Sequence, residues 1–211
     1  MRKVFLIFIC LVSMYALQAQ YAGYTLVQDL GKFRSDFAAA SQKTLTIKSN
    51  FVQEKDLSML AEKIVSKGKF WFKKENLVRM EYNHPFQYLM IINKDKVYVK
   101  DAQRENKVSA KSNKLFQQVN RIMIDCMQGT TLNNADFKTR VFENKTAYLV
   151  EMVPVVKGLK DMFKNINAVV DKKDYSVNSI EMQELSGDNT VIRFSNKELN
   201  TTIQDALFAI K

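Results

Sequence analysis

Few side chains of this sequence belong to the types that perform covalent chemistry. Its single histidine, His84, precedes Pro85 in a turn between two apolar segments. A zinc site needs several ligands and a catalytic triad needs a positioned base, so one histidine in a turn supports neither. Cys126 shares the apolar side of a helical pattern with Ile122 and Met123, which indicates a packed thiol and not a nucleophile.

Carboxylate pairs and phosphate-binding loops give no stronger signal. Asp171 and Asp174 lie close together, but they belong to a charged hairpin turn, where solvated carboxylates are more common than a general acid/base pair. The sequence has neither a glycine-rich phosphate loop nor a Cys-x-x-Cys motif. We therefore expect a protein that is not an enzyme and that uses no cofactor and no metal.

The first nineteen residues have the pattern of a secretory signal peptide. Arg2 and Lys3 precede the apolar run Val4–Tyr15, and small residues lead to a cleavage site after Ala19. The apolar run is shorter than the roughly 20 residues that span a bilayer. The sequence thus predicts export to the periplasm, with residues 1–19 removed and residues 20–211 forming a single domain.

Composition fits an ordinary globular core in that domain. The 211 residues are 46% hydrophobic and carry a net charge of +10, and loss of Arg2 and Lys3 leaves 10 − 2 = +8. Only Cys126 of the two cysteines remains, so packing alone must hold the domain. No nucleic acid is expected as a partner of an exported protein. The excess of lysine indicates either solvated strand faces or attraction to an anionic membrane surface or an acidic partner.

The spacing of apolar residues predicts helices and strands in a definite order. Apolar residues at spacings of three and four predict a helix over Tyr24–Ala39 and another over Leu115–Met127, which Gly129 ends, with a short helical turn around Leu159–Phe163. Alternation of apolar and polar residues, with short polar turns between, predicts ten strands: Leu45–Val52, Ile64–Lys73, Leu77–Tyr82, Tyr88–Ile92, Lys96–Lys100, Lys138–Phe142, Ala147–Val153, Ile166–Val170, Val177–Glu184 and Thr190–Asn196.

This order predicts a mainly β fold with a few helices. We expect an open, strongly curved antiparallel β-barrel whose concave face is covered by a helical lid. Such a fold either packs solid or encloses an apolar cavity, and periodicity does not distinguish the two. The abundance of methionine and phenylalanine is compatible with a cavity wall, because methionine adapts its shape to variable apolar partners, although it equally suits a packed core.

Several segments together resemble the periplasmic outer-membrane lipoprotein carrier family, LolA. The F-x-Q strand of that family corresponds to Phe51-Val52-Gln53, and its glycine-containing aromatic strand with a basic turn corresponds to residues 66–76. The strand that ends before a proline corresponds to Leu77–Tyr82 with Pro85, and the following hairpin to Ile91–Val99. The resemblance extends from the N-terminal helix to about Phe194.

The resemblance implies a cavity that shelters the acyl chains of a lipoprotein. Exposing a chain of about fifteen methylenes costs on the order of 12 kcal/mol, at about 0.8 kcal/mol for each, so a lipoprotein needs an escort through water. The implied partners are acylated lipoproteins and an inner-membrane lipoprotein-releasing complex, with delivery to the outer membrane. A role for an outer-membrane receptor stays open, and a monomer is expected.

The resemblance also implies site residues. The family's turn arginine, which ties the barrel to its lid, corresponds to Lys74, followed here by Glu75 where the family has proline. Lysine keeps the charge of arginine but lacks its planar fork. The acyl-chain cavity is expected to be lined by residues of one strand and of the lid helix: Val78, Met80, Tyr82, Leu115, Phe116, Val119 and Met123.

Two alternatives remain open beside the carrier. A module of the same fold could bind another lipid or a hydrophobic small molecule, as a sensor or a specialised carrier. An exported hydrolase is disfavoured, because any such mechanism would depend on His84 alone.

Overall fold

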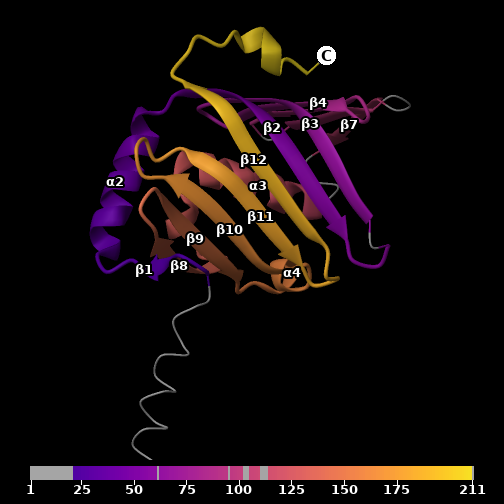
Figure 1. Ribbon diagram of the computed structural model, residues 1–211. Helices are drawn as coiled ribbons and strands as arrows, with labels where there is room; N and C mark the ends of the chain where they lie inside the picture. The colour runs from indigo at the N-terminus through magenta and orange to yellow at the C-terminus, as the bar shows by residue number, and fades with distance from the viewer. Residues whose placement is uncertain (1–20, 61, 95, 102–104, 110–113, 211) are drawn as a thin grey trace, which may run out of the picture.

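One antiparallel sheet dominates the computed structural model (Figure 1). The structure describes residues 21–60, 62–94, 96–101, 105–109 and 114–210, without the side chains of 105–109 and 114–120. The predicted signal peptide, residues 1–19, thus lies outside the described residues. The elements are β1 (Thr25–Leu26), α2 (Leu30–Lys43), β2 (Thr46–Leu57), β3 (Glu62–Lys73), β4 (Leu77–His84), β5 (Tyr88–Asn93), β6 (Lys96–Asp101), β7 (Glu105–Ser109), α3 (Lys114–Gln128), β8 (Phe137–Glu143), β9 (Ala147–Pro154), α4 (Lys157–Lys160), β10 (Phe163–Asp171), β11 (Val177–Glu184) and β12 (Asn189–Leu199), with two 3-10 turns, η1 (Thr131–Asn133) and η2 (Asp205–Phe208).

The twelve strands form two meanders joined by their end strands. The order across the sheet is β1-β8-β9-β10-β11-β12-β2-β3-β4-β5-β6-β7, and every neighbouring pair is antiparallel. The junction pairs β12 with β2, where Phe194 lies opposite Phe51. The sheet therefore depends at its centre on two segments that lie far apart in sequence.

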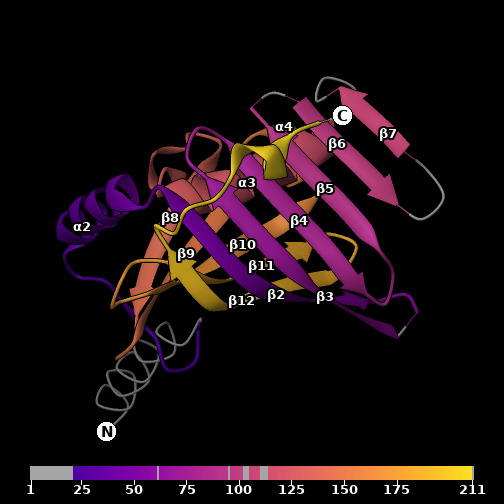
Figure 2. The ribbon, with the colours of Figure 1, turned by 90° about the horizontal axis from the view of Figure 1, so that it is seen from above.

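The predicted barrel is correct in strand type and order but not in its curvature. The sheet stays open, because the edge strands β1 and β7 pair only with β8 and β6 among the described residues, and the sheet is not strongly curled (Figure 2). The two faces of the open sheet carry different coverings. We call the face toward α3 the inner face and the opposite face the outer face.

The N-terminal helix begins later than its apolar spacing predicts. The helix α2 starts at Leu30, because the side chain of Asp29 accepts a hydrogen bond of 2.8 Å from the backbone N–H of Lys32 and caps it. The preceding residues Thr25 and Leu26 are extended and pair with β8. The prediction of a helix from Tyr24 was wrong in its first residues, since pairing with the sheet overrides the local pattern.

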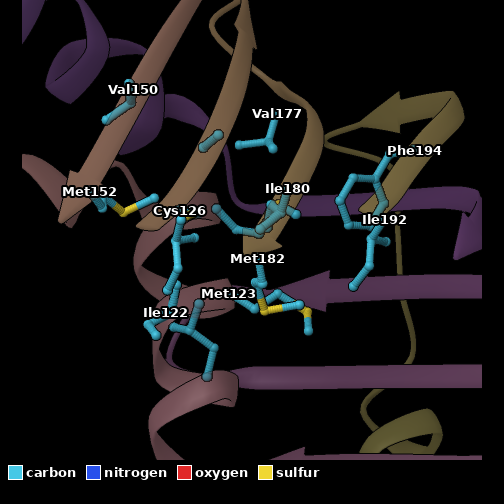
Figure 3. Packing of buried hydrophobic residues seen from close by; sticks show 14 of the residues in the cluster. Ile122, Met123, Cys126, Val150, Met152, Val177, Ile180, Met182, Ile192 and Phe194 are labelled. Carbon is cyan, nitrogen blue, oxygen red and sulfur yellow. The ribbon is translucent and has the colours of Figure 1, made fainter. Parts of the chain in front are cut away.

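Helices α2 and α3 cover the inner face and close the hydrophobic core. Figure 1 shows α3 behind β10, β11 and β12, with α2 beside the same half of the sheet. Alternate strand residues point toward α3, as Figure 3 shows for Met152, Ile180 and Met182 facing Cys126 and its helical neighbours. None of the helices in the described ranges is both long and apolar enough to cross a membrane.

The C-terminal segment covers part of the outer face. Figure 2 shows it crossing β4 and β5, where Ile203 and Phe208 pack with Trp71, Ile91 and Tyr98 in a second, smaller cluster. The apolar residues of this segment show neither helical nor strand periodicity. Side chains of the sheet hold its backbone: the Nζ of Lys73 donates to the carbonyl of Ile203, and the guanidinium of Arg79 donates to that of Leu207 at 2.8 Å.

A row of polar side chains crosses the outer face of the other half of the sheet. Arg140, Glu151, Asn167 and Glu181 lie opposite one another on β8, β9, β10 and β11. The Glu151 carboxylate is buried, binds the Arg140 guanidinium at 2.6 Å and accepts a hydrogen bond of 2.8 Å from the Tyr21 hydroxyl. This network anchors the start of the described chain to the sheet.

Candidate functional site

The strand residues predicted to line a cavity lie on the inner face of β4. Alternation along the strand points Val78, Met80 and Tyr82 inward, whereas Arg79 and Glu81 form an ion pair on the outer face. Val78 and Met80 are buried, and their neighbours across the strand are Ile92 and Met90 of β5. The inner face of β4 is therefore apolar over its whole buried length.

The helix residues predicted for the same cavity lie on α3. Met123 is buried and belongs to the same hydrophobic core as Val78 and Met80. Figure 3 shows the Met123 side chain next to Met182 of β11. The side chains of the other predicted residues, Leu115, Phe116 and Val119, lie outside the described residues, although the helix itself is present at their positions. The structure thus brings Val78, Met80 and Met123 into one core.

Tyr82 marks the point where the core meets the surface. Its hydroxyl donates to the Oε1 of Gln53 at 2.9 Å, and its ring packs edge-on against Phe51 and Tyr88, with centroids 4.8 and 5.3 Å away. Burial raises the pKa of Tyr82 well above its ordinary value, so the hydroxyl stays neutral. This side chain combines an apolar body with one satisfied polar group, which suits the edge of an apolar site.

A depression opens beside Tyr82 at the end of β4. Its volume is about 520 Å³, and a second depression of about 570 Å³ shares four of its lining residues. The first is lined by Gln53, Ser66, Tyr82, Pro85, Phe86, Gln87, Tyr88 and Asp101. Sequence reasoning missed Phe86 and Tyr88 here, although Phe86 in a turn was a visible signal because turns seldom carry an aromatic residue.

Lys74 lies in the β3–β4 turn and contacts helix α2. Its Nζ donates at 2.8 Å to the backbone carbonyl of Gln42, in the last turn of α2, where a cation also complements the helix dipole. The turn itself is tight, since Glu75 and Asn76 both have positive φ angles. The side chain predicted from the resemblance thus contacts a helix, but this helix is α2 and not α3.

The same turn also contacts helix α3. The Nε2 of Gln128, the last residue of α3, donates to the Oδ1 of Asn76 at 3.0 Å. Sequence reasoning did not single out Asn76, since its turn conformation was the only role that the pattern suggested. The β3–β4 turn therefore holds the C-terminal ends of both helices, and we call residues 74–76 with these two hydrogen bonds the latch.

The two helices meet close to the latch without room for a side chain. Gly129 follows α3 with a φ angle of 68°, and a Cβ there would lie 2.1 Å from the hydroxyl oxygen of Ser41 in α2. Glycine is thus required by both conformation and space. The sequence pattern identified Gly129 as the end of α3, and the structure adds its contact with α2.

The residues considered for catalysis are exposed, buried in the core or hydrogen-bonded within a turn. His84 is exposed, and Cys126 is buried where desolvation raises the pKa of its thiol to about 12, so it is not a thiolate at neutral pH. Asp171 and Asp174 accept hydrogen bonds of 2.8 Å from the backbone N–H groups of Lys173 and Ser176 in their turn. In the chain as described, no three His, Cys, Asp or Glu side chains are grouped to hold a metal.

These features define a mainly β protein in which helices cover an apolar sheet face and are fixed at one corner by few polar contacts. Residues 42–211 match the model of the family described as outer membrane lipoprotein carrier protein LolA. The chain belongs to this family. Its sequence matches none of the curated proteins.

Comparison with solved structures finds matches at low sequence identity, and one of them reaches a TM-score of 0.50. An uncharacterized conserved protein from Thermus thermophilus has a TM-score of 0.50 and 9% identity, over 86% of this chain and 94% of that one. A LolA superfamily protein from Nitrosomonas europaea has a TM-score of 0.47 and 11% identity, over 84% and 97% of the two chains. A putative outer membrane lipoprotein-sorting protein domain from Vibrio parahaemolyticus has 0.45 and 9%, over 85% and 94%.

Proposed function

We propose that this protein is a periplasmic, non-enzymatic carrier that binds the acyl chains of lipoproteins and delivers them to the outer membrane. Membership of the LolA family supports the class of function. The observation that carries the proposal is the core between α3 and the sheet, in which adaptable apolar side chains such as Met80 and Met123 lie under a helix held at its end by the latch.

In this proposal, cargo binding separates α3 from the inner face. Side chains of β4 and α3 that pack against the core in the closed form then contact acyl chains instead: Val78, Met80, Tyr82 and Met123. The predicted residues Leu115, Phe116 and Val119 add to the same wall. Because apolar contacts replace apolar contacts, opening costs little once cargo is present. Lys74 would act as a gating residue, since its hydrogen bond to Gln42 is lost when the helices move.

In this proposal the cargo moves from the inner to the outer membrane, the direction that membership of the LolA family supports. Acylated proteins would reach the carrier from an inner-membrane lipoprotein-releasing complex, after export directed by residues 1–19. No chemical bond changes in the transfer, so no catalytic group, metal or cofactor is needed. Release to the outer membrane requires loose binding, which adaptable apolar side chains such as Met80 and Met123 favour.

Native mass spectrometry of the protein purified without detergent from the periplasm of its own host tests the proposal. We expect mass above that of residues 20–211, from co-purified acylated lipoproteins. A Met80→Gln variant, checked for folding by circular dichroism, should lose this added mass, whereas Leu45→Gln, which changes an exposed leucine, should keep it. A protein that stays bare when acylated lipoprotein is offered would refute the proposal, and a bound free lipid would favour the alternative binding module.

A further inference from the structure

Exposed apolar side chains gather at one end of the sheet. In the sheet order, β9, β11, β2 and β4 are each separated from the next by one antiparallel strand. They therefore run in the same direction, and their C-terminal ends lie at the same end of the sheet. Within the described residues, eight of the ten exposed large hydrophobic side chains lie at this end. We call these eight residues the rim: Met59, Leu60, Ile64, Val65, Phe86, Val155, Val156 and Leu185.

Hydrogen bonds join three segments of the rim: the β2–β3 tip, the β11–β12 turn and the end of α4. The backbone N–H of Ser58 in the β2–β3 tip donates to the Oδ1 of Asp188 in the β11–β12 turn at 3.0 Å. The N–H of Leu185 in the same turn donates to the carbonyl of Met162, just after α4, at 2.9 Å. In Figure 1 the β2–β3 tip, the β11–β12 turn and α4 lie together at the lower right.

The most exposed rim residues protrude from hairpin tips, and the others lie at the start of β3 and between β9 and α4. Met59 is 92% exposed and Leu60 is 67% exposed at the β2–β3 tip, and Phe86 is 76% exposed at the β4–β5 turn. Polar residues normally occupy such turns, because they hydrogen-bond the backbone and face water. Protruding apolar side chains on separate tips do not form the flat, closely packed patch of a protein interface, but they fit insertion between lipid headgroups.

Lysines accompany one segment of the rim, whereas two other segments are acidic. Residues 54–65 carry three carboxylates against Lys55 and Lys63, and residues 184–188 carry Glu184 and Asp188. Residues 155–164 carry Lys157, Lys160 and Lys164 against Asp161, a net charge of 3 − 1 = +2 in ten residues. These three lysines are exposed and take part in no ion pair within the part of the chain that is described. Without residues 1–19 the chain has a net charge of 10 − 2 = +8. Clusters of lysine beside exposed apolar residues are attracted to anionic lipid headgroups.

The depression beside Tyr82 opens at the same end. Phe86 of the rim lines it, together with Ser66 of β3, close to Ile64 and Val65. A lipid surface in contact with the rim would therefore lie next to the entrance of the proposed acyl-chain site. An acyl chain could pass between membrane and carrier without crossing water.

We propose that the rim docks on a lipid bilayer and inserts its apolar side chains between the headgroups, with the lysines of residues 155–164 next to anionic lipids. Its use in cargo transfer rests on the proposed function, but the docking itself is a property of the empty protein. The docked orientation places the depression against the membrane and leaves the latch at the opposite end, since the β3–β4 turn lies at the other end of β4 from Phe86.

Vesicle flotation of the cargo-free protein tests this inference. The wild-type protein should float with vesicles of phosphatidylethanolamine and phosphatidylglycerol, and less with vesicles of phosphatidylcholine alone. The variant Met59→Asp/Leu60→Asp should reduce the bound fraction about tenfold, because charged side chains do not insert. The matched control is Leu26→Asp/Leu45→Asp, which changes two leucines, 60% and 55% exposed, at the other end of the sheet.

Three outcomes would overturn the inference: no flotation of the wild-type protein, equal loss in the matched control, or unchanged flotation of the rim variant. Lys157→Gln/Lys160→Gln should lower binding to anionic vesicles while leaving binding to phosphatidylcholine unchanged. Native mass spectrometry separates this inference from the proposed function. The rim variant should still bind acylated lipoprotein, since neither side chain belongs to the core, and absence of cargo from the wild-type protein would refute the carrier function but not the docking.

Discussion

Breaking the latch should open the helices without unfolding the protein. The variant Lys74→Met/Asn76→Gly removes both hydrogen bonds of the latch, those to Gln42 and from Gln128. Glycine at position 76 keeps the turn, because the φ angle of 63° there is one that glycine adopts without strain. The change therefore acts on the helix contacts and not on the β3–β4 pairing.

The size of the effect follows from two exposed hydrogen bonds. Each contributes about 0.5–1 kcal/mol, at the lower end of the usual net range because both sites face water. Together they hold the closed form by about 1–2 kcal/mol, which corresponds to a rise of about 5–30-fold in the population of the open form.

Cys126 provides a native reporter of this opening. Cys126 belongs to α3, and its thiol is buried between this helix and the sheet, so a thiol reagent reaches it only when the helix moves. Burial also raises the pKa of the thiol to about 12, which keeps it unreactive in the closed form. We expect the rate of Cys126 modification by a chromogenic disulfide reagent to rise about 5–30-fold in the double variant. Urea unfolding should show that most of the global stability remains.

Lys73→Met is the matched control for the latch. This neighbouring lysine binds the C-terminal segment on the outer face through Ile203 and Asp205, and not a helix. An equal rise in Cys126 modification for Lys73→Met, or an unchanged rate in the latch variant, would refute the role of the latch.

Three further predictions concern packing and pH. Gly68→Ala should lower the free energy of unfolding by about 3 kcal/mol in urea titrations, because the added Cβ would lie 1.9 Å from the backbone carbonyl oxygen of Glu81; an unchanged midpoint would contradict this close approach. Phe208→Ala should cost about 3–5 kcal/mol and shift the fluorescence of Trp71, the single tryptophan, to longer wavelength, since this cluster would open to water; emission that stays at its wild-type wavelength would show that the C-terminal segment does not cover the ring. Burial, with the nearby Glu151 carboxylate, raises the pKa of Tyr21 to about 12, whereas tyrosine in the unfolded chain has a pKa of about 10. The folded state therefore holds this proton more tightly, and the resulting stability is complete below about pH 10 and is lost as the pH rises toward 12. Tyr21→Phe should weaken that loss in denaturation curves measured across this range.

Sequence patterns correctly predicted those elements whose apolar residues recur with regular helical or strand spacing. The predicted helix Leu115–Met127 corresponds to α3, because its apolar residues recur with helical spacing and Gly129 ends it. The turn at residues 74–76 was also predicted, and its side chains contact both helices. Of the predicted cavity residues, Val78, Met80 and Met123 share one core, whereas their role in binding remains a proposal.

Elements that depend on distant partners were missed or shortened. The strand β2 continues to Leu57, five residues beyond its predicted end, because ion pairs such as Lys55 with Glu184 and Glu54 with Lys63 replace the apolar alternation there. The C-terminal segment binds through isolated residues such as Phe208, and so has no period to detect. The rim was invisible for the same reason, since it gathers tips from both meanders.

The pairing of β12 with β2 determines when the protein can fold. During synthesis the meander from β2 to β7 emerges first. Strand β12, which pairs with the other edge of β2, is not made until residues 189–199 appear. Until then β2 has an unpaired edge, a common starting point for aggregation. Contacts of such long sequence separation also slow folding. Truncation before β12 should therefore yield an aggregating product and not a smaller working domain.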